Sequence, residues 1–162
     1  QQSKLGEAVF AACHGHDWQL AVHLLKAYNI EDERRPSPHL QVISCCGRAR
    51  CWPVALQVLA DMMLASAVPN VHEFSAAVTA CEKGLQWKVA LEVLALMHVV
   101  SVSPNVFSFS ATISACEKAG EWQTALSLLS GMLSGMAKVA PNVYSFSGAI
   151  SACEKASEWQ TA

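Results

Sequence analysis

A polar pattern suited to nucleic-acid contacts recurs three times between residues 72 and 155. Each copy holds an aromatic ring, then two hydroxyl side chains and a lysine at helical spacing: His72, Ser75, Thr79 and Lys83; Phe107, Ser110, Ser114 and Lys118; Tyr144, Ser147, Ser151 and Lys155. This spacing places the four side chains on one face of a helix. Rings can stack on nucleobases, hydroxyls can bond base edges and cations can bind phosphates. Arg48 holds the cationic position in an earlier copy.

The same residue types also form ordinary solvent-exposed helix surface, and this second interpretation stays open. Glu82, Glu117 and Glu154 each precede the lysine of their copy and partly cancel its charge. The net charge of −2 and the pI near 6.3 provide no general attraction to nucleic acid. Any RNA binding must therefore come from local patches.

The tryptophans reveal the elements that must hold this polar face. All five occupy the same position of a sequence repeat, at intervals of 34, 35, 35 and 37 residues: Trp18, Trp52, Trp87, Trp122 and Trp159. An alanine follows each one three residues later, and a leucine follows the first four seven residues later, which is helical spacing. A period in the mid-thirties predicts helix pairs that stack in a line. We expect the indole rings to be buried where successive units meet.

The sequence of each unit indicates where its helices begin and end. The first helix carries an apolar face such as Phe109, Ile113 and Cys116, and the tryptophan stripe forms the second helix. Gly120 is placed to end a first helix, and the Pro-Asn-Val tripeptides at 69–71, 104–106 and 141–143 end one unit and cap the next. The sequence predicts one all-α array of about four and a half units. Their expected bounds are 1–35, 36–70, 71–105, 106–142 and an incomplete 143–162.

Cysteine and histidine positions give no strong sign of a metal site. Four of the seven cysteines recur six residues before a tryptophan, which suits small buried hydrophobes in a reducing compartment: Cys46, Cys81, Cys116 and Cys153. The segment Cys13-His14-Gly15-His16 resembles metal ligands, but we interpret it as a loop between helices.

Other features argue against a membrane protein or an enzyme. The longest uncharged run, 93–116, is broken by Ser103-Pro104-Asn105, which argues against a transmembrane helix. Paired carboxylates, a nucleophile beside a base and a glycine-rich phosphate loop are all missing from the sequence. We therefore expect a noncatalytic protein without cofactor or metal.

Taken together, these motifs resemble the pentatricopeptide repeat family. The resemblance rests on the helix pair of about 35 residues, the Pro-Asn-Val boundary, the aromatic-Ser start and the Ala-Cys-Glu-Lys end of the first helix, and it is strongest from Pro69 onward. The tetratricopeptide repeat fits less well, because its first-helix Leu-Gly and Tyr signature is missing. The resemblance implies a right-handed α-solenoid of chloroplasts or mitochondria that binds single-stranded RNA, one base per repeat, in RNA processing, stability or translation.

The resemblance also assigns roles to individual residues. The family's base-reading pairs fall on Ser75 with Asn105 and on Ser110 with Asn142, a combination that favours adenine, while Ser147 has no partner within the chain. Base stacking falls on His72, Phe107 and Tyr144, where family members usually have aliphatic residues. The phosphate contacts fall on Arg48, Lys83, Lys118 and Lys155. Leu40 replaces the reading serine of the 36–70 copy, which is expected to read no base.

A second functional hypothesis concerns proteins instead of RNA. Two complete reading pairs give weak affinity and limited discrimination. The chain is 52% hydrophobic and only 15% charged, against about 25% in ordinary soluble proteins. An apolar surface of this kind would suit a scaffold or structural subunit of a large organellar complex, either ribosomal or in a photosynthetic or respiratory membrane.

Overall fold

The computed structural model describes residues 2–15, 17–27, 38–65, 67–135 and 138–156. All regular structure in these ranges is α-helical. The helices are α1 (Gln2–His14), α2 (Trp18–Lys26), α3 (Pro38–Arg48), α4 (Trp52–Leu64), α5 (Val71–Lys83), α6 (Trp87–Val99), α7 (Val106–Ala119), α8 (Trp122–Leu133) and α9 (Val143–Lys155).

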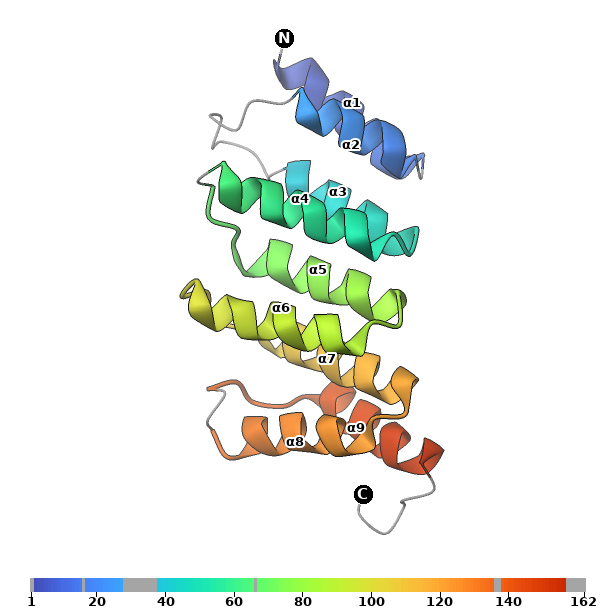
Figure 1. Ribbon diagram of the computed structural model, residues 1–162, viewed down its shortest axis with the longest axis vertical. Coiled ribbons are helices and arrows are strands. Elements are labelled where there is room, and N and C mark those ends of the chain that lie inside the picture. Colours follow the sequence, from blue (N-terminus) through green and yellow to red (C-terminus); the bar gives the residue numbers. More distant parts are fainter. Residues whose placement is uncertain (1, 16, 28–37, 66, 136–137, 157–162) are drawn as a thin grey trace.

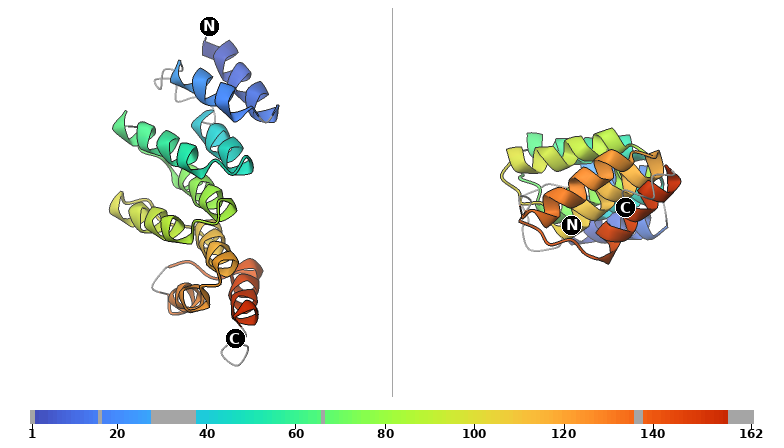
Figure 2. Two further views of the ribbon diagram at one scale, coloured as in Figure 1. Left: turned by 45° about the vertical axis from the view of Figure 1, so that its right-hand side comes forward. Right: turned by 90° about the horizontal axis from the view of Figure 1, so that it is seen from below.

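Successive helix pairs stack into an elongated array with α1 and α9 at opposite ends (Figure 1). The first helices α1, α3, α5, α7 and α9 form one layer, in which each contacts the next. The second helices α2, α4, α6 and α8 form the other layer, and each packs on the first helix of its own unit and of the following unit (Figure 2). This arrangement confirms the predicted all-α solenoid.

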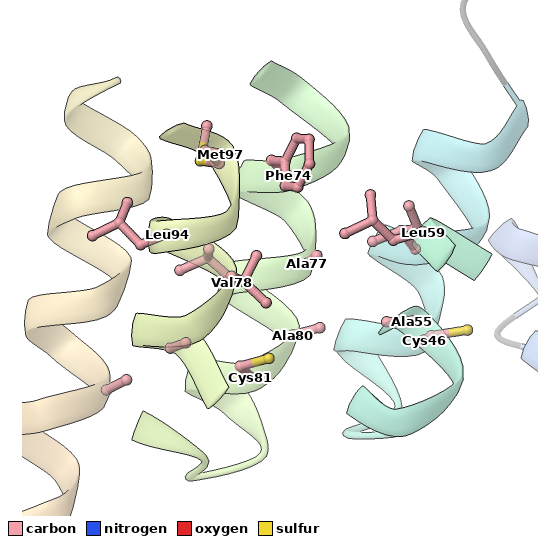
Figure 3. Close-up of a cluster of buried hydrophobic side chains, with 14 of the residues drawn as sticks. Cys46, Ala55, Leu59, Phe74, Ala77, Val78, Ala80, Cys81, Leu94 and Met97 are labelled. Carbon is pink, nitrogen blue, oxygen red and sulfur yellow. The ribbon is translucent and has the colours of Figure 1, made fainter. Parts of the chain in front are cut away.

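The core runs continuously between the two layers. Phe74, Val78 and Cys81 on α5 are fully buried, and Phe74 lies between Leu59 of the preceding unit and Met97 of its own second helix (Figure 3). Each apolar face is thus covered by neighbouring units. In α9 the matching residues Phe146 and Ile150 are 40% and 52% exposed, because no described helix packs on that side.

The tryptophans lie at the rim of this core. Trp18, Trp52, Trp87 and Trp122 begin the second helices and are only partly buried, while Trp159 lies outside the described residues. The ring of Trp52 lies against Gly84 of the next unit, where an added Cβ would be 2.4 Å from the ring atom Cδ1. The indole rings that we expected to be buried where units meet do pack on the core, but they are only partly buried. The core between units consists of smaller residues, and the ring of Trp52 packs at the edge of that core.

The predicted helix starts at the asparagines and the predicted helix end at Gly120 are confirmed. Asn70, Asn105 and Asn142 are the N-caps of α5, α7 and α9, and each forms a reciprocal capping box with the third residue of its helix. Gly120 ends α7 in the left-handed conformation, with φ of 76°. Arg50 and Leu85 hold the matching turns of earlier units at φ of 58° and 59°, although neither is glycine.

The recurring cysteines are buried, as the repeat pattern predicted. Loss of solvation raises the pKa of Cys46 to about 12 and the pKa values of Cys81 and Cys116 to about 11.

Two other sequence features can be placed. Cys13 and His14 end α1 and Gly15 follows in a turn, whereas His16 lies outside the described residues. Within the described part, side chains of His, Cys, Asp and Glu do not gather in any group of three suited to a metal ion. The helices described there are also all too short or too polar to cross a membrane.

Candidate nucleic-acid interface

The predicted polar face is an exposed, hollowed surface of the first-helix layer. The rings of Phe107 and Tyr144 are 69% and 76% exposed, and His72 is also exposed. A hollow of about 480 Å³ lies between α5, α7 and α9 and includes both Phe107 and Tyr144. Its polar lining is mainly hydroxyl: Thr79, Ser110, Ser114, Ser147 and Ser151, with the amide of Asn142.

Both complete reading pairs are brought together because the last residue of each unit, an asparagine, caps the first helix of the next unit beside the serine. The hydroxyl of Ser75 lies 3.3 Å from Oδ1 of Asn105, and it also donates to the carbonyl of Val71 at 2.7 Å. The hydroxyl of Ser110 lies 3.2 Å from Oδ1 of Asn142. Residues 30 and 32 positions apart in sequence therefore meet because Asn stands at the unit boundary.

Helix capping fixes the orientation of both amides. Oδ1 of Asn105 accepts the backbone N–H of Ser108 at 2.9 Å, and Oδ1 of Asn142 accepts that of Ser145 at 3.0 Å. Each Oδ1 is thus committed to its own helix, whereas Nδ2 has no partner among the described residues and keeps two donors. A free amide donor beside a hydroxyl that can accept suits a base edge with an acceptor next to an amine. Adenine and cytosine present such edges.

The capping serines Ser108 and Ser145 contact the predicted reading residues, and the sequence analysis did not identify them. The hydroxyl of Ser145 lies 2.9 Å from that of Ser110 and donates to Oδ1 of Asn142 at 3.1 Å, which joins cap and reading pair in one network. Ser108 holds the equivalent position beside Asn105. Their place as third residue after a predicted Asn cap was the available signal.

Two of the predicted phosphate-binding cations are paired with carboxylates of the preceding unit. Lys118 lies 2.7 Å from Glu82 and Lys155 lies 2.8 Å from Glu117. Glu82 also accepts the hydroxyl of Ser114 at 3.0 Å. We expected the glutamates to offset lysines of their own copies, but the pairing runs between units. Both acids line the hollow and are less than a fifth exposed.

The remaining residues predicted to contact RNA lie in different environments. Lys83 is exposed, and Arg48 donates to the carbonyl of Cys13 at 3.1 Å. Arg48 also lines a second hollow of about 370 Å³ between α1 and α3, together with Leu40. Asn70 caps α5, but Leu40 offers it no hydroxyl. Ser147 is exposed on α9.

Sequence profiles match the centre of the chain. A profile described as pentatricopeptide repeat domain matches residues 57–119, and one described as PPR repeat matches residues 107–135. No curated protein has a significantly similar sequence.

Solved structures with the same fold cover nearly the whole chain. The pentatricopeptide repeat protein PPR10 from maize has a TM-score of 0.80 at 20% identity, over 99% of this chain and 23% of the maize chain. The PPR domain of Arabidopsis thaliana protein-only RNase P 1, solved in complex with tRNA, has a TM-score of 0.74 at 14% identity, over 99% of this chain and 86% of that domain. PPR10 with an 18-nt psaJ RNA element has a TM-score of 0.76 at 19% identity, over 96% and 23% of the two chains. The chain thus spans less than a quarter of the maize protein it resembles.

Proposed function

The chain belongs to the pentatricopeptide repeat family, and we propose that it binds single-stranded RNA along the exposed face of α5, α7 and α9. The observation that carries this proposal is the meeting of each reading serine with the boundary asparagine of its own unit, at 3.3 and 3.2 Å. PPR10 and the RNase P domain, which share the fold, were solved with RNA.

In this proposal each unit with a complete pair reads one base. The base stacks between exposed rings such as Phe107 and Tyr144, which flank the hydroxyl-lined hollow. Its edge accepts from Nδ2 of the asparagine and donates an amine proton to the serine oxygen. This geometry suits adenine and cytosine, and the resemblance to the family favours adenine at both pairs.

The first prediction tests base reading directly. We expect the chain to bind a short oligoadenylate more tightly than an oligouridylate, and Ser110→Ala to reduce that ratio about tenfold, because a good base contact is worth about 1 to 3 kcal/mol. Fluorescence anisotropy titration gives both affinities.

Ser127→Ala is a matched control, because Ser127 is exposed on α8 in the other layer. It should leave the ratio unchanged. Equal affinity of the unsubstituted chain for both oligonucleotides would exclude base reading.

A specific observation also favours a protein-binding role. Leu64, Val99 and Leu133 end three successive second helices and are 82%, 78% and 60% exposed. Between α4 and α6 lies a largely apolar hollow of about 230 Å³. An apolar row of this kind suits a protein partner within a larger organellar complex. A fixed partner that survives RNase treatment, with no RNA affinity in the titration, would favour this scaffold role over RNA binding.

The broader setting is also part of the proposal. By family resemblance we place the protein in a chloroplast or mitochondrion, where it would support RNA processing, stability or translation without catalysing a reaction itself. The hollow between α5, α7 and α9 supports a binding role through its hydroxyls, the amide of Asn142 and the rings of Phe107 and Tyr144.

A further inference from the structure

The ion pairs along the first-helix layer are offset by one unit. Lys118 of α7 pairs with Glu82 of α5, and Lys155 of α9 pairs with Glu117 of α7. The offset leaves a lysine without a carboxylate at one end of the series and an acid without a lysine at the other. Among the described residues these are Lys83 and Glu154, neither of which forms an ion pair.

Lys83 lacks a carboxylate because of the residue one unit earlier. Gly47 occupies the position held by Glu82 and Glu117 in later units. A Cβ on Gly47 would lie 3.3 Å from both Cα and Cβ of Ala80, so close packing of α3 on α5 favours glycine there. The same packing thus removes the acid that would neutralise Lys83.

Arg48 repeats this situation one unit earlier. Its guanidinium reaches back with the same offset as the lysines, but it meets the neutral carbonyl of Cys13 instead of a carboxylate. Among the described residues no carboxylate lines the hollow that Arg48 borders, whereas Glu82 and Glu117 both line the hollow between α5, α7 and α9. Within this part of the chain the positive charges of Arg48 and Lys83, at two successive positions, have no carboxylate partner.

From this charge distribution we propose that RNA phosphates bind at Arg48 and Lys83, and that Lys118 and Lys155 serve to tie successive units together. This inference rests on the proposed RNA binding and refines it. Arg48 lies in the 36–70 copy, which is expected to read no base, and Lys83 lies in the 71–105 copy, which also carries the Ser75–Asn105 pair. Phosphate attraction is thus concentrated toward the N-terminal side of the polar face, whereas the copy from residue 106 selects a base without a phosphate contact from Lys118.

The test is the salt dependence of oligouridylate binding, because phosphate contacts do not depend on the base. Each phosphate contact on a single strand contributes about 0.7 to the slope of log affinity against log salt. Arg48→Gln with Lys83→Gln should lose about 1.4 of that slope. Lys118→Gln with Lys155→Gln should leave the slope unchanged.

A second pair of variants tests the phosphate assignment in the opposite direction, through an expected gain of phosphate contacts. Glu82→Gln with Glu117→Gln should release Lys118 and Lys155 and increase the slope by about 1.4. Thermal melting of every variant identifies any loss of folding. Lys83→Gln alone serves as a further variant, since Lys83 is exposed and forms no ion pair in the described part, and it should lose about 0.7.

The outcomes separate this inference from the proposed function. If the unsubstituted chain binds neither oligonucleotide, RNA binding itself fails. If it binds and the slope falls with Lys118 and Lys155 instead of Arg48 and Lys83, RNA binding stands and the phosphate assignment is overturned. An unchanged slope in all variants would overturn it as well.

Discussion

At the scale of single residues, Asn105 and Asn142 each serve two purposes. Their Oδ1 atoms cap α7 and α9, and their Nδ2 donors remain available beside the serine of the reading pair. Only Ser, Thr, Asp and Asn are strong caps, so folding restricts this position to a small set of residues. Each member of that set offers different donors and acceptors to a base. In the proposed RNA-binding role, the requirement for a helix start would therefore limit which bases such a unit can select.

Gly84 provides a residue-scale test of the contact between units. An added Cβ would lie 2.4 Å and 2.9 Å from two ring atoms of Trp52, so Gly84→Ala should destabilise the chain by about 1 to 3 kcal/mol in urea unfolding. Ala119 occupies the matching position at the end of α7 and is exposed, which shows that alanine itself suits that position.

A double-mutant cycle isolates the ring contact. In a Trp52→Ala background the Gly84→Ala substitution should have almost no effect, because the ring that obstructs the methyl group is gone. The same loss in both backgrounds would show that the cost lies elsewhere than in this contact.

At the scale of elements, the turn inside each unit sets how its two helices meet. Arg50, Leu85 and Gly120 occupy equivalent positions, and all three have positive φ. For a residue with a Cβ this conformation costs about 1 to 2 kcal/mol, whereas glycine adopts it freely. Two of the three units thus hold a strained turn, which packing of their helices maintains.

Substitutions at this turn should have opposite signs. Gly120→Ala should lose about 1 kcal/mol, and a Cβ there would meet nothing within 4 Å, so the loss reports backbone preference alone. Leu85→Gly should gain stability, and because the leucine side chain is already 56% exposed, its removal should offset only part of that gain. Urea unfolding measures both changes. A stable Gly120→Ala variant would contradict the assigned strain.

Much of the fold was predictable because helix starts and stops are local. The Asn caps at 70, 105 and 142, the stop at Gly120 and the apolar faces all follow from neighbouring residues. The partial burial of Trp52 and the pairing of Lys118 with Glu82 could not be predicted. Both depend on the rise and rotation between stacked units, which spacing in the sequence does not determine. The pairing of Ser75 with Asn105 and of Ser110 with Asn142 was predicted only from the family resemblance.

At the scale of the whole molecule, the repeated cysteines link stability to alkaline pH. Burial raises the pKa values of Cys81 and Cys116 to about 11, while a thiol in the unfolded chain ionises near 9.0. Between these values the unfolded state binds fewer protons than the folded state, so unfolding becomes more favourable as pH rises. Below pH 9 these thiols are protonated in both states and contribute no pH dependence.

Thermal melting across this range tests the linkage. The melting temperature should fall from pH 9 to pH 11, with each buried thiol contributing about 1.4 kcal/mol per pH unit. The double variant Cys81→Ala, Cys116→Ala should show a shallower fall, because its remaining pH dependence comes from other groups. Parallel curves for the variant and the unsubstituted chain would refute the assignment.

The offset between Glu82 and Lys118 bears on how such an array can evolve. Each tandem duplication of a unit with this pattern adds one glutamate and one lysine, and both find partners in adjacent copies. Under the proposed reading of one base per unit, the recognition sequence would lengthen by one nucleotide at a time while the net charge stays constant. Lengthening would therefore sharpen discrimination among transcripts without increasing the indiscriminate attraction that a growing cationic surface would exert on cellular RNA.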